Sequence, residues 1–530
     1  MLSRVRGSSR ASWWLTFVLL ASLGGFWALG SAPTGAPDER DHVINASAVA
    51  RGELVGDRLT RAQRSALAPG NGQKSAYRSL DVPELYGETN TGCFAFQKEV
   101  TAACLHFSGS TRVVPVVTNV AWYPPAYYAL VGLLTRPVPA GSKALYAMRL
   151  VTVAVMAALL ASAVASLRRG PSSRLRLLGF LGALTPMVLF LDASVNPNGP
   201  EIAAGLALWA SGAVLVDEVG AGAEPDGRLI RRVGIAAVVL ALSRQDSLLW
   251  LGLIVVVLLA LAGRRGIASL WRATGLRTWT AVVAVCGAAQ VAWILVVGTL
   301  SADHSVFAPL DLPAHEAIRA AIGRSPEWYH EMIGTFGWLD TPSPALTVVT
   351  WTVVIGALLA LAMALGRRRW WLATVVVFAI TFLLPIALEF AQAVGWATGH
   401  WQGRYALPFA VGVPLLATMS LERDGPGARL SASLLPVGLA AALGVASVFA
   451  FAQNVRRYTV GYDGHVWFFL DPQWSPPGGA LLITVGFTVA MGLTIAWLLT
   501  GSDPVAPPDA ALDQDPVDAP VATPAPFGAR

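Results

Sequence analysis

A cluster of acidic residues and a histidine follows the first apolar run of the chain. Asp38, Glu39 and Asp41 lie within four residues of one another, and His42 comes next. Carboxylates this close raise one another's pKa, and histidine titrates near neutrality. The set could supply a general base or the ligands of a divalent metal ion, although nothing in the sequence makes any cofactor certain. The alternative is a solvated loop with ordinary charges.

The second candidate group is aromatic. Trp122, Tyr123, Tyr127 and Tyr128 flank the pair Pro124–Pro125. Two consecutive prolines fix an extended entry into a helix, and the rings offer stacking faces for a sugar or an isoprenoid. The alternative is a belt of aromatics at the membrane interface that binds no ligand.

A third group consists of amides in a turn between two apolar runs. Asn196 and Asn198 lie in this turn, with Glu201 three residues further on. Amides and a carboxylate at a helix start could contact a polar ligand. They could equally cap the helix and do nothing more.

Two arginines lie next to apolar runs on the predicted outer side of the membrane, where the positive-inside rule predicts few basic residues. Arg244 interrupts an apolar stretch and is followed closely by Asp246, while Arg404 opens another apolar run and precedes Tyr405. A guanidinium could hold a phosphate through paired hydrogen bonds. The alternatives are an Arg244–Asp246 ion pair that offsets its own burial and an Arg404 that reaches to the interface, with Glu389 as its partner.

The composition decides what kind of protein must position these groups. Of 530 residues, 55% are hydrophobic and 13% are charged, whereas a soluble domain carries about 25% charged residues. A mean hydropathy of +0.56 excludes a soluble enzyme, a disulfide-rich secreted domain and a disordered chain. The net charge of +6 includes no dense basic run with aromatics, so no nucleic acid partner is expected. We predict an all-α, polytopic membrane protein embedded in a lipid bilayer.

Apolar runs predict about 12 transmembrane helices. The short connections predicted to be cytoplasmic carry most of the arginines, so the positive-inside rule places both termini in the cytoplasm. The richness in Arg, Ala, Gly and Pro is typical of a high-GC bacterial genome, and we expect a multi-pass protein of the bacterial plasma membrane. The predicted spans are 11–30, 143–167, 175–192, 199–217, 232–243, 247–262, 278–299, 345–366, 370–391, 405–421, 432–453 and 479–500.

This interpretation divides the chain into four parts. The segment 119–136 is apolar but contains Pro124 and Pro125, and counting it as a span would invert every later loop, so we predict an interfacial helix there. Cys93 and Cys104 lie in the polar stretch that follows the first predicted span, and whether they form a disulfide stays open. The parts are a cytoplasmic N-terminus with the first helix at 1–31, an extracytoplasmic loop with interfacial helices at 32–142, a bundle at 143–501 with an outer loop at 300–344, and a disordered cytoplasmic tail at 502–530.

Four segments together resemble a known family. They are Tyr-Pro-Pro-Ala-Tyr-Tyr at 123–128, Asn-Pro-Asn-Gly at 196–199, Phe-Gly-Trp-Leu-Asp at 336–340 and Gln-Gly-Arg-Tyr-Ala-Leu-Pro at 402–408. Their order and spacing are similar to those of the domain-of-unknown-function 2142 family, predicted bacterial polytopic membrane proteins, over roughly residues 12–500. Asn198 stands where that family usually has Asp.

The family in turn resembles the GT-C glycosyltransferases, which take a sugar from a polyprenyl-phosphate carrier at the outer face of the membrane. The resemblance implies a GT-C-like fold with a large first outer loop, in which acidic residues follow the first span, as Asp38 and Glu39 do here. It implies that Asp38 is the catalytic base and that Glu39 orients it or binds a metal ion. The residues expected to bind substrate are His42, Trp122, Tyr123, Tyr127, Tyr128, Asn196, Asn198, Arg244, Arg404 and Tyr405.

The sequence therefore favours a glycosyltransferase that moves a sugar from a polyprenyl-phosphate carrier to a cell-envelope acceptor. One alternative is a transporter or flippase for a lipid-linked or polar solute, which would favour internal repeats that this chain does not show. Another is a non-catalytic component of an envelope polysaccharide complex, with the acidic tail docking onto envelope-biosynthesis proteins.

Overall fold

A computed structural model gives the fold of most of the chain. It describes residues 9–67, 77–169, 173–298, 312–394, 401–421 and 426–500. The predicted tail at 502–530, the first eight residues and the start of the predicted loop at 300–344 lie outside the described residues.

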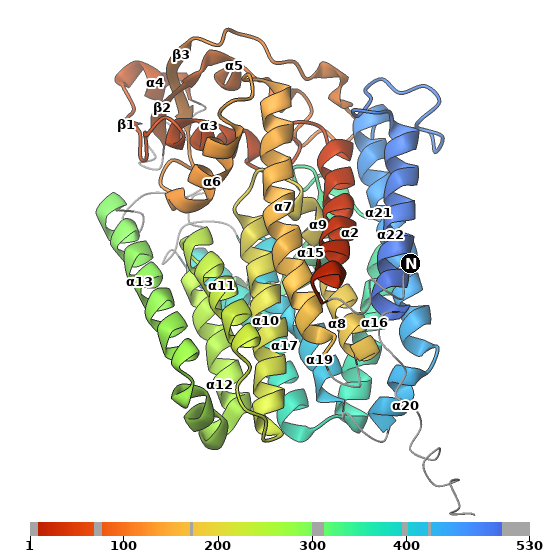
Figure 1. Cartoon of the computed structure of the whole chain (residues 1–530). Helices are drawn as coiled ribbons and strands as arrows, with labels where there is room; N and C mark the ends of the chain where they lie inside the picture. The colour runs from red at the N-terminus through yellow and green to blue at the C-terminus, as the bar shows by residue number, and fades with distance from the viewer. Residues whose placement is uncertain are drawn as a thin grey trace, which may run out of the picture.

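Long apolar helices stand side by side and form the body of the molecule (Figure 1). Within the described residues, nine are long and apolar enough to cross a membrane. Side chains such as those of α2 and α10 pack into one continuous apolar core. The predicted all-α polytopic class is confirmed. The nine helices are α2 (Ser9–Gly30), α7 (Ser142–Leu167), α10 (Asn198–Gly220), α12 (Ser247–Arg272), α13 (Thr274–Val297), α16 (Ala345–Leu365), α17 (Arg368–Ala393), α21 (Leu435–Val460) and α22 (Ala480–Thr500).

The other predicted spans form shorter or broken helices. Helices α8 (Ser173–Ala183) and α9 (Pro186–Asp192) meet at a bend of 69° and together could make a tenth span. Pro186 at the start of α9 has no N–H to donate to the preceding turn, which favours a break between the two helices. The predicted count of twelve is not confirmed, because the remaining segments are short: α11 (Gly227–Ser243), α18 (Leu407–Ala410) and α19 (Gly412–Ser420), with α20 (Pro426–Ala432) beyond them.

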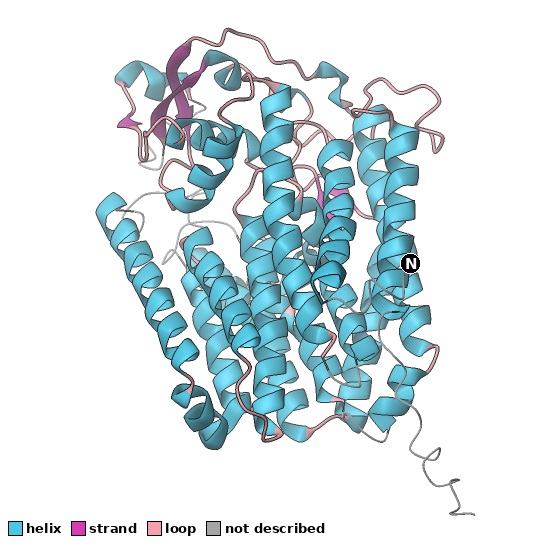
Figure 2. Cartoon of the chain, in the orientation of Figure 1, coloured by secondary structure: helices cyan, strands magenta, loops and turns pink. Residues whose placement is uncertain are grey.

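Short elements between α2 and α7 cover one end of the bundle, which we call the sheet-bearing end (Figure 2). Its antiparallel sheet has the order β1-β2-β3, with Leu80 opposite Val116, and these two side chains are buried against α3. The elements are α3 (Glu39–Val49), β1 (Asp57–Arg58), α4 (Arg61–Ala66), β2 (Arg78–Pro83), α5 (Glu84–Gly87), the 3-10 turns η2 (Thr91–Cys93) and η3 (Ala102–Cys104), β3 (Val113–Thr118) and α6 (Pro125–Thr135).

Helix α6 is the segment that we predicted to lie at the interface. Its 11 residues fall well short of the roughly 20 that a transmembrane helix needs. It packs along α3 and leaves Leu130, Leu133 and Leu134 exposed. The close packing requires Gly132, since a Cβ there would collide with the carbonyl oxygen of Ala46.

Arg457 ties the sheet-bearing end to the bundle, at a loop that a disulfide closes. Cys93 and Cys104 form a disulfide, and the buried Arg457 of α21 donates to the carbonyls of Phe94 and Val100 within the same loop. Arg457 also lies 3.1 Å from Asp340. The chain between α13 and α16 adds α14 (Ala314–Gly323), α15 (Ser325–Gly334), β4 (Thr335–Phe336) and β5 (Thr341–Pro342), and η5 (Gly403–Ala406) precedes α18.

Candidate functional site

Asp38 is an accessible carboxylate at the start of α3. Its backbone is left-handed, with φ at 60°, so the chain turns sharply between the end of α2 and the first turn of α3. The side chain is 38% exposed, and its Oδ2 lies 3.6 Å from Nη2 of Arg404. A left-handed aspartate costs backbone energy that only the surrounding contacts can offset. Those contacts therefore hold the carboxylate where it stands.

Arg404 is buried and has donors to spare. Only 3% of its side chain is exposed, yet Nε and Nη1 have no hydrogen-bond partner in the part of the chain that the structure describes. The preceding residue fixes its place: the N–H of Gly403 donates to Glu331, and a Cβ on Gly403 would collide with the carbonyl of Trp328. The glycine of the Gln-Gly-Arg-Tyr segment is thus needed for close packing against α15. A buried guanidinium with unused donors beside a carboxylate suits an anionic ligand.

Arg244 lies at the junction of α11 and α12, close to the same place. It forms ion pairs of 3.4 Å with both Glu201 and Asp246. Its guanidinium also lies 4.9 Å from the ring centre of Tyr405 and 5.8 Å from that of Tyr123. Two aromatic rings thus flank the cation, and both rings are only partly buried.

Glu39 is adjacent to Asp38 in sequence but points into the protein. Its side chain is fully buried, and Arg149 of α7 binds both oxygens, at 2.7 and 2.6 Å. The N–H of Val195 donates to Oε1 as well. The same guanidinium donates to three carbonyls at the end of α2, those of Ala28, Ser31 and Ala32. Both carboxylate oxygens are therefore engaged within the protein, which leaves Glu39 the role of fixing the turn that carries Asp38.

His42 sits one turn into α3 and is buried. Its Nδ1 lies 2.8 Å from the hydroxyl of Tyr128. Burial, followed by the charges of Arg244 and Arg404, lowers the pKa of His42 well below its ordinary value. The imidazole is consequently neutral at physiological pH. It orients the hydroxyl network beside the site and adds no charge to it.

Asp41 has the opposite tendency. Burial raises its pKa from the ordinary value of 3.8 to about 6, against the opposing effect of Arg40. The two side chains lie 3.9 Å apart. Asp41 therefore holds its proton more tightly than a solvated aspartate does.

The predicted aromatic residues separate into two sets. Trp122, Tyr127 and Tyr128 are buried, with 7% or less of each exposed. The hydroxyl of Tyr127 bonds to Thr152 of α7 at 2.9 Å. These three rings support the site from within, whereas Tyr123 flanks Arg244.

Asn196 and Asn198 form hydrogen bonds with other residues of the protein. Asn196 donates to the carbonyl of Pro37 at 3.3 Å and accepts from the N–H of Asn198. Asn198 donates to Glu201 at 2.9 Å, and Ser247 donates to the same carboxylate at 2.8 Å. The Asn-Pro-Asn turn thereby links the Asp38 loop to the Arg244 junction.

The expected pairing of Glu389 with Arg404 is wrong. Glu389 binds Arg324 at 2.9 Å and accepts from the N–H of Trp401 at 2.6 Å. Asp38 is the acid that faces Arg404 instead. Within the part of the chain that the structure describes, no group of three His, Cys, Asp or Glu side chains is placed to hold a metal ion.

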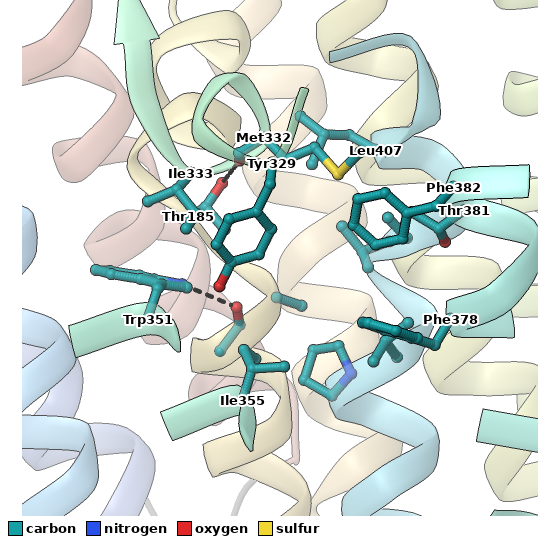
Figure 3. A pocket seen from close by; sticks show the side chains of 16 residues that line it. Thr185, Tyr329, Met332, Ile333, Trp351, Ile355, Phe378, Thr381, Phe382 and Leu407 are labelled. Atoms are coloured by element: carbon teal, nitrogen blue, oxygen red, sulfur yellow. Dashed lines mark hydrogen bonds between the residues drawn. The ribbon is translucent and has the colours of Figure 1, made fainter. Parts of the chain in front are cut away.

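An apolar pocket lies beside the η5–α18 segment, within the bundle. Tyr329, Trp351, Phe378 and Phe382 surround it (Figure 3), and its volume is about 80 Å³. Leu407 lines it as well, one helical turn along the chain from Arg404. A hydrocarbon chain suits such a lining, because almost none of it is polar.

Sequence reasoning missed two residues that hold the site together. Arg149 lies inside an apolar run that we treated as an ordinary span. An arginine in such a run is costly unless it is paired, so its presence alone signalled a buried acid elsewhere. Glu331 lies in α15, and nothing in the sequence indicates that its carboxylate accepts the N–H of Gly403.

Comparison with known families identifies the chain. The profile of a family described as predicted membrane protein, DUF2142, matches residues 21–413. The chain belongs to this family. The DUF2142 resemblance drawn from the four sequence segments is thereby confirmed.

Comparisons with individual proteins add the following. No curated protein matches the sequence. A crystal structure of ArnT from Cupriavidus metallidurans bound to undecaprenyl phosphate is similar at 15% identity and a TM-score of 0.43, covering 93% of this chain and 77% of ArnT. The apo structure of that ArnT is similar at 14% identity and a TM-score of 0.41, with the same coverage.

Proposed function

We propose that this DUF2142 protein is a membrane glycosyltransferase that moves a sugar from a polyprenyl-phosphate carrier to a cell-envelope acceptor. The observation that carries the proposal is the pair formed by Asp38 and Arg404: an accessible carboxylate 3.6 Å from a buried guanidinium with unused donors. Such a pair offers a base and an anion-binding group at the same place. A phosphate-bearing donor and a hydroxyl-bearing acceptor need these two groups.

In the proposed reaction, Asp38 removes the proton from an acceptor hydroxyl. The acceptor oxygen then attacks the anomeric carbon of the donor sugar, and the bond from that carbon to the carrier phosphate oxygen breaks. The carrier phosphate leaves with the bonding electron pair. Arg404 and Arg244 stabilise the negative charge that develops on it.

The carrier's hydrocarbon chain has a place in the same proposal. Leu407, which lines the apolar pocket, directly follows the η5 turn that contains Arg404. A phosphate held by Arg404 would leave the first isoprene units beside this pocket, and the remaining units would extend into the surrounding lipid.

The remaining predicted site residues take supporting roles. Tyr123 and Tyr405, which flank Arg244, would contact the sugar or the phosphate. Glu39 and Asn196 fix the Asp38 turn through Arg149 and the Pro37 carbonyl. The buried side chains behind them position the site without touching substrate: His42, Trp122, Tyr127, Tyr128 and Asn198.

The proposal places the sheet-bearing end on the outer face of the bacterial plasma membrane and both termini in the cytoplasm. The arginine distribution supports this orientation. The Cys93–Cys104 disulfide lies at the sheet-bearing end, and disulfides persist in oxidising compartments. Substrates would then reach Asp38 from outside the cell.

The test is sugar transfer by the purified full chain in proteoliposomes, supplied with a panel of radiolabelled polyprenyl-phosphate sugars. Transfer or donor hydrolysis is expected in the wild type, and Asp38→Asn should reduce it by about 10²- to 10⁴-fold. Asp57→Asn is the matched control, because Asp57 is an exposed aspartate of β1 at the same end of the molecule.

Two results would contradict the proposal. One is full activity in Asp38→Asn. The other is the absence of turnover of every donor by well-folded wild type, which would favour a transporter or a non-catalytic component of an envelope complex.

A further inference from the structure

A second cavity lies at the other end of the helix pair that carries the site. It has a volume of about 470 Å³ and is lined by the ends of α3 and α6, the 137–140 connection and the first turns of α7, with Pro83, Tyr86 and Thr111 beside them. Ser47 is the lining residue of α3 nearest to Asp38 in sequence, and nine residues of helix at 1.5 Å per residue separate the two by roughly 13 Å. The cavity is thus distinct from the candidate catalytic site.

The charges of the cavity have one sign. Arg51 and Arg136 line it, and no Asp or Glu is among the described residues that do so. Ser47 holds one end of Arg51, since both its carbonyl and its hydroxyl accept from Nη1, at 2.7 and 2.6 Å. The hydroxyls of Ser47, Tyr86 and Thr111 also belong to lining residues. An orienting contact on one guanidinium nitrogen leaves the rest of the fork to bind an anion bidentately.

The surroundings indicate that the anion belongs to a lipid. Gly132, Thr135 and Arg136 of the α6 end line the cavity, while Leu130, Leu133 and Leu134 of the same helix are 42%, 55% and 61% exposed. Helix α6 lies just beyond the ends of α11 and α13 at the sheet-bearing end (Figure 1). A cationic cavity next to exposed leucines, near the level where α11 and α13 end, matches a phosphate head group with its hydrocarbon chains alongside.

We propose that this cavity binds the phosphate head group of an anionic membrane lipid, with the leucine face of α6 contacting the acyl chains. Arg51 and Arg136 hold the phosphate oxygens, and the buried Ser47 fixes Arg51. The preference for a net-negative lipid follows from two guanidinium groups with no carboxylate among the described lining residues to balance them. The inference does not depend on the proposed transferase activity, since it concerns a different cavity and a different lipid.

The test measures lipid that stays bound to the full chain. Protein reconstituted in a mixture of phosphatidylcholine and phosphatidylglycerol is extracted in mild detergent, and retained lipid is quantified by native mass spectrometry. Wild type should retain phosphatidylglycerol, and Arg51→Gln/Arg136→Gln should retain on the order of 10-fold less. Both arginines are exposed, so this variant should fold.

A matched control removes two other arginines from the same end. Arg58→Gln/Arg64→Gln makes the same change in charge at exposed positions outside the cavity, and it should retain lipid as the wild type does. Equal retention in the cavity variant and the wild type would overturn the proposal. So would an equal loss in both double variants, because it would show a diffuse surface charge effect.

Glycerol phosphate distinguishes the source of the anion. If the soluble compound displaces retained phosphatidylglycerol from wild type, the cavity recognises the phosphate of the lipid. If it binds to protein that retains no phosphatidylglycerol, the cavity takes a soluble anion and the lipid assignment fails.

Discussion

Arg149 and Arg404 are both buried, and they differ in what their donors bind. The guanidinium of Arg149 donates hydrogen bonds to both oxygens of Glu39 and to three carbonyls at the end of α2. Among the described residues, Arg404 contacts Asp38 at 3.6 Å and the Tyr405 hydroxyl at 3.5 Å, and two of its nitrogens have no hydrogen-bond partner. One cation is saturated by the protein, and the other is held in place with its donors free.

The difference separates a structural role from a ligand-binding role. A buried cation with every donor engaged stabilises the elements that it joins, and its removal leaves carbonyls and a carboxylate without partners. A buried cation with free donors contributes little to folding, because its desolvation is not offset until an anion arrives. The two acids differ in the same way: the carboxylate of Glu39 is buried and bonded to Arg149, while that of Asp38 is accessible.

The largest effect expected from this comparison is the loss of Arg149. Arg149→Met leaves the Glu39 carboxylate buried without its cation, which should lower the free energy of unfolding by about 3–5 kcal/mol. The measurement is thermal unfolding in mild detergent. Glu39→Leu/Arg149→Met should recover part of the loss, because it removes the stranded charge. A wild-type midpoint in the single variant would contradict the structural role of Arg149.

The disulfide closes a loop whose carbonyls bind a second buried arginine. Arg457 donates to carbonyls within the loop closed by Cys93 and Cys104. Replacing both cysteines by serine should cost about 2–3 kcal/mol for a loop of this length. The thermal midpoint under oxidising conditions measures it, with reductant as the control: reductant should shift the wild type toward the variant and leave the variant unchanged.

Arg404 should behave in the opposite way. Arg404→Gln is expected to leave the thermal midpoint within the range of the wild type. Binding of a polyprenyl phosphate should weaken by about 10- to 100-fold, because hydrogen bonds to the phosphate are lost. Isothermal titration in detergent measures the affinity, and Arg58→Gln is the matched control. A large fall in the midpoint with unchanged affinity would reverse the roles of the two arginines.

The smallest expected effect concerns Asp41. Its folded pKa of about 6 lies above the ordinary 3.8, so the folded protein holds this proton more tightly than the unfolded chain does. The stability from Asp41 is therefore present below pH 4 and is lost as pH rises through 6. Asp41→Asn should be more stable than the wild type by about 1–2 kcal/mol at pH 8 and equal to it near pH 4. Unfolding at the two pH values checks this sign.

Much of the fold could be predicted from the sequence, because apolar runs report membrane spans directly. The break at Pro186 and the shortness of α11 could not, since hydropathy does not say where a helix bends or stops inside an apolar environment. Asp38, Arg244 and Arg404 could be selected as candidates because each is a charge next to an apolar run. Their meeting in space could not be read from sequence, and neither could the partner of Glu39, since both depend on how distant helices pack.

The bond between Glu39 and Arg149 also sets an order in biosynthesis. The two residues are 110 positions apart, and a ribosome adds roughly 5–20 residues per second. Glu39 therefore leaves the ribosome some 5–22 s before the cation that seals it. During that interval the carbonyls at the end of α2 lack the hydrogen bonds from Arg149, and the Asp38 turn lacks the ion pair that fixes Glu39. The nascent chain must keep the Glu39 carboxylate in water until α7 has entered the membrane. The candidate site is therefore assembled late, although Asp38 and Glu39 are synthesised early.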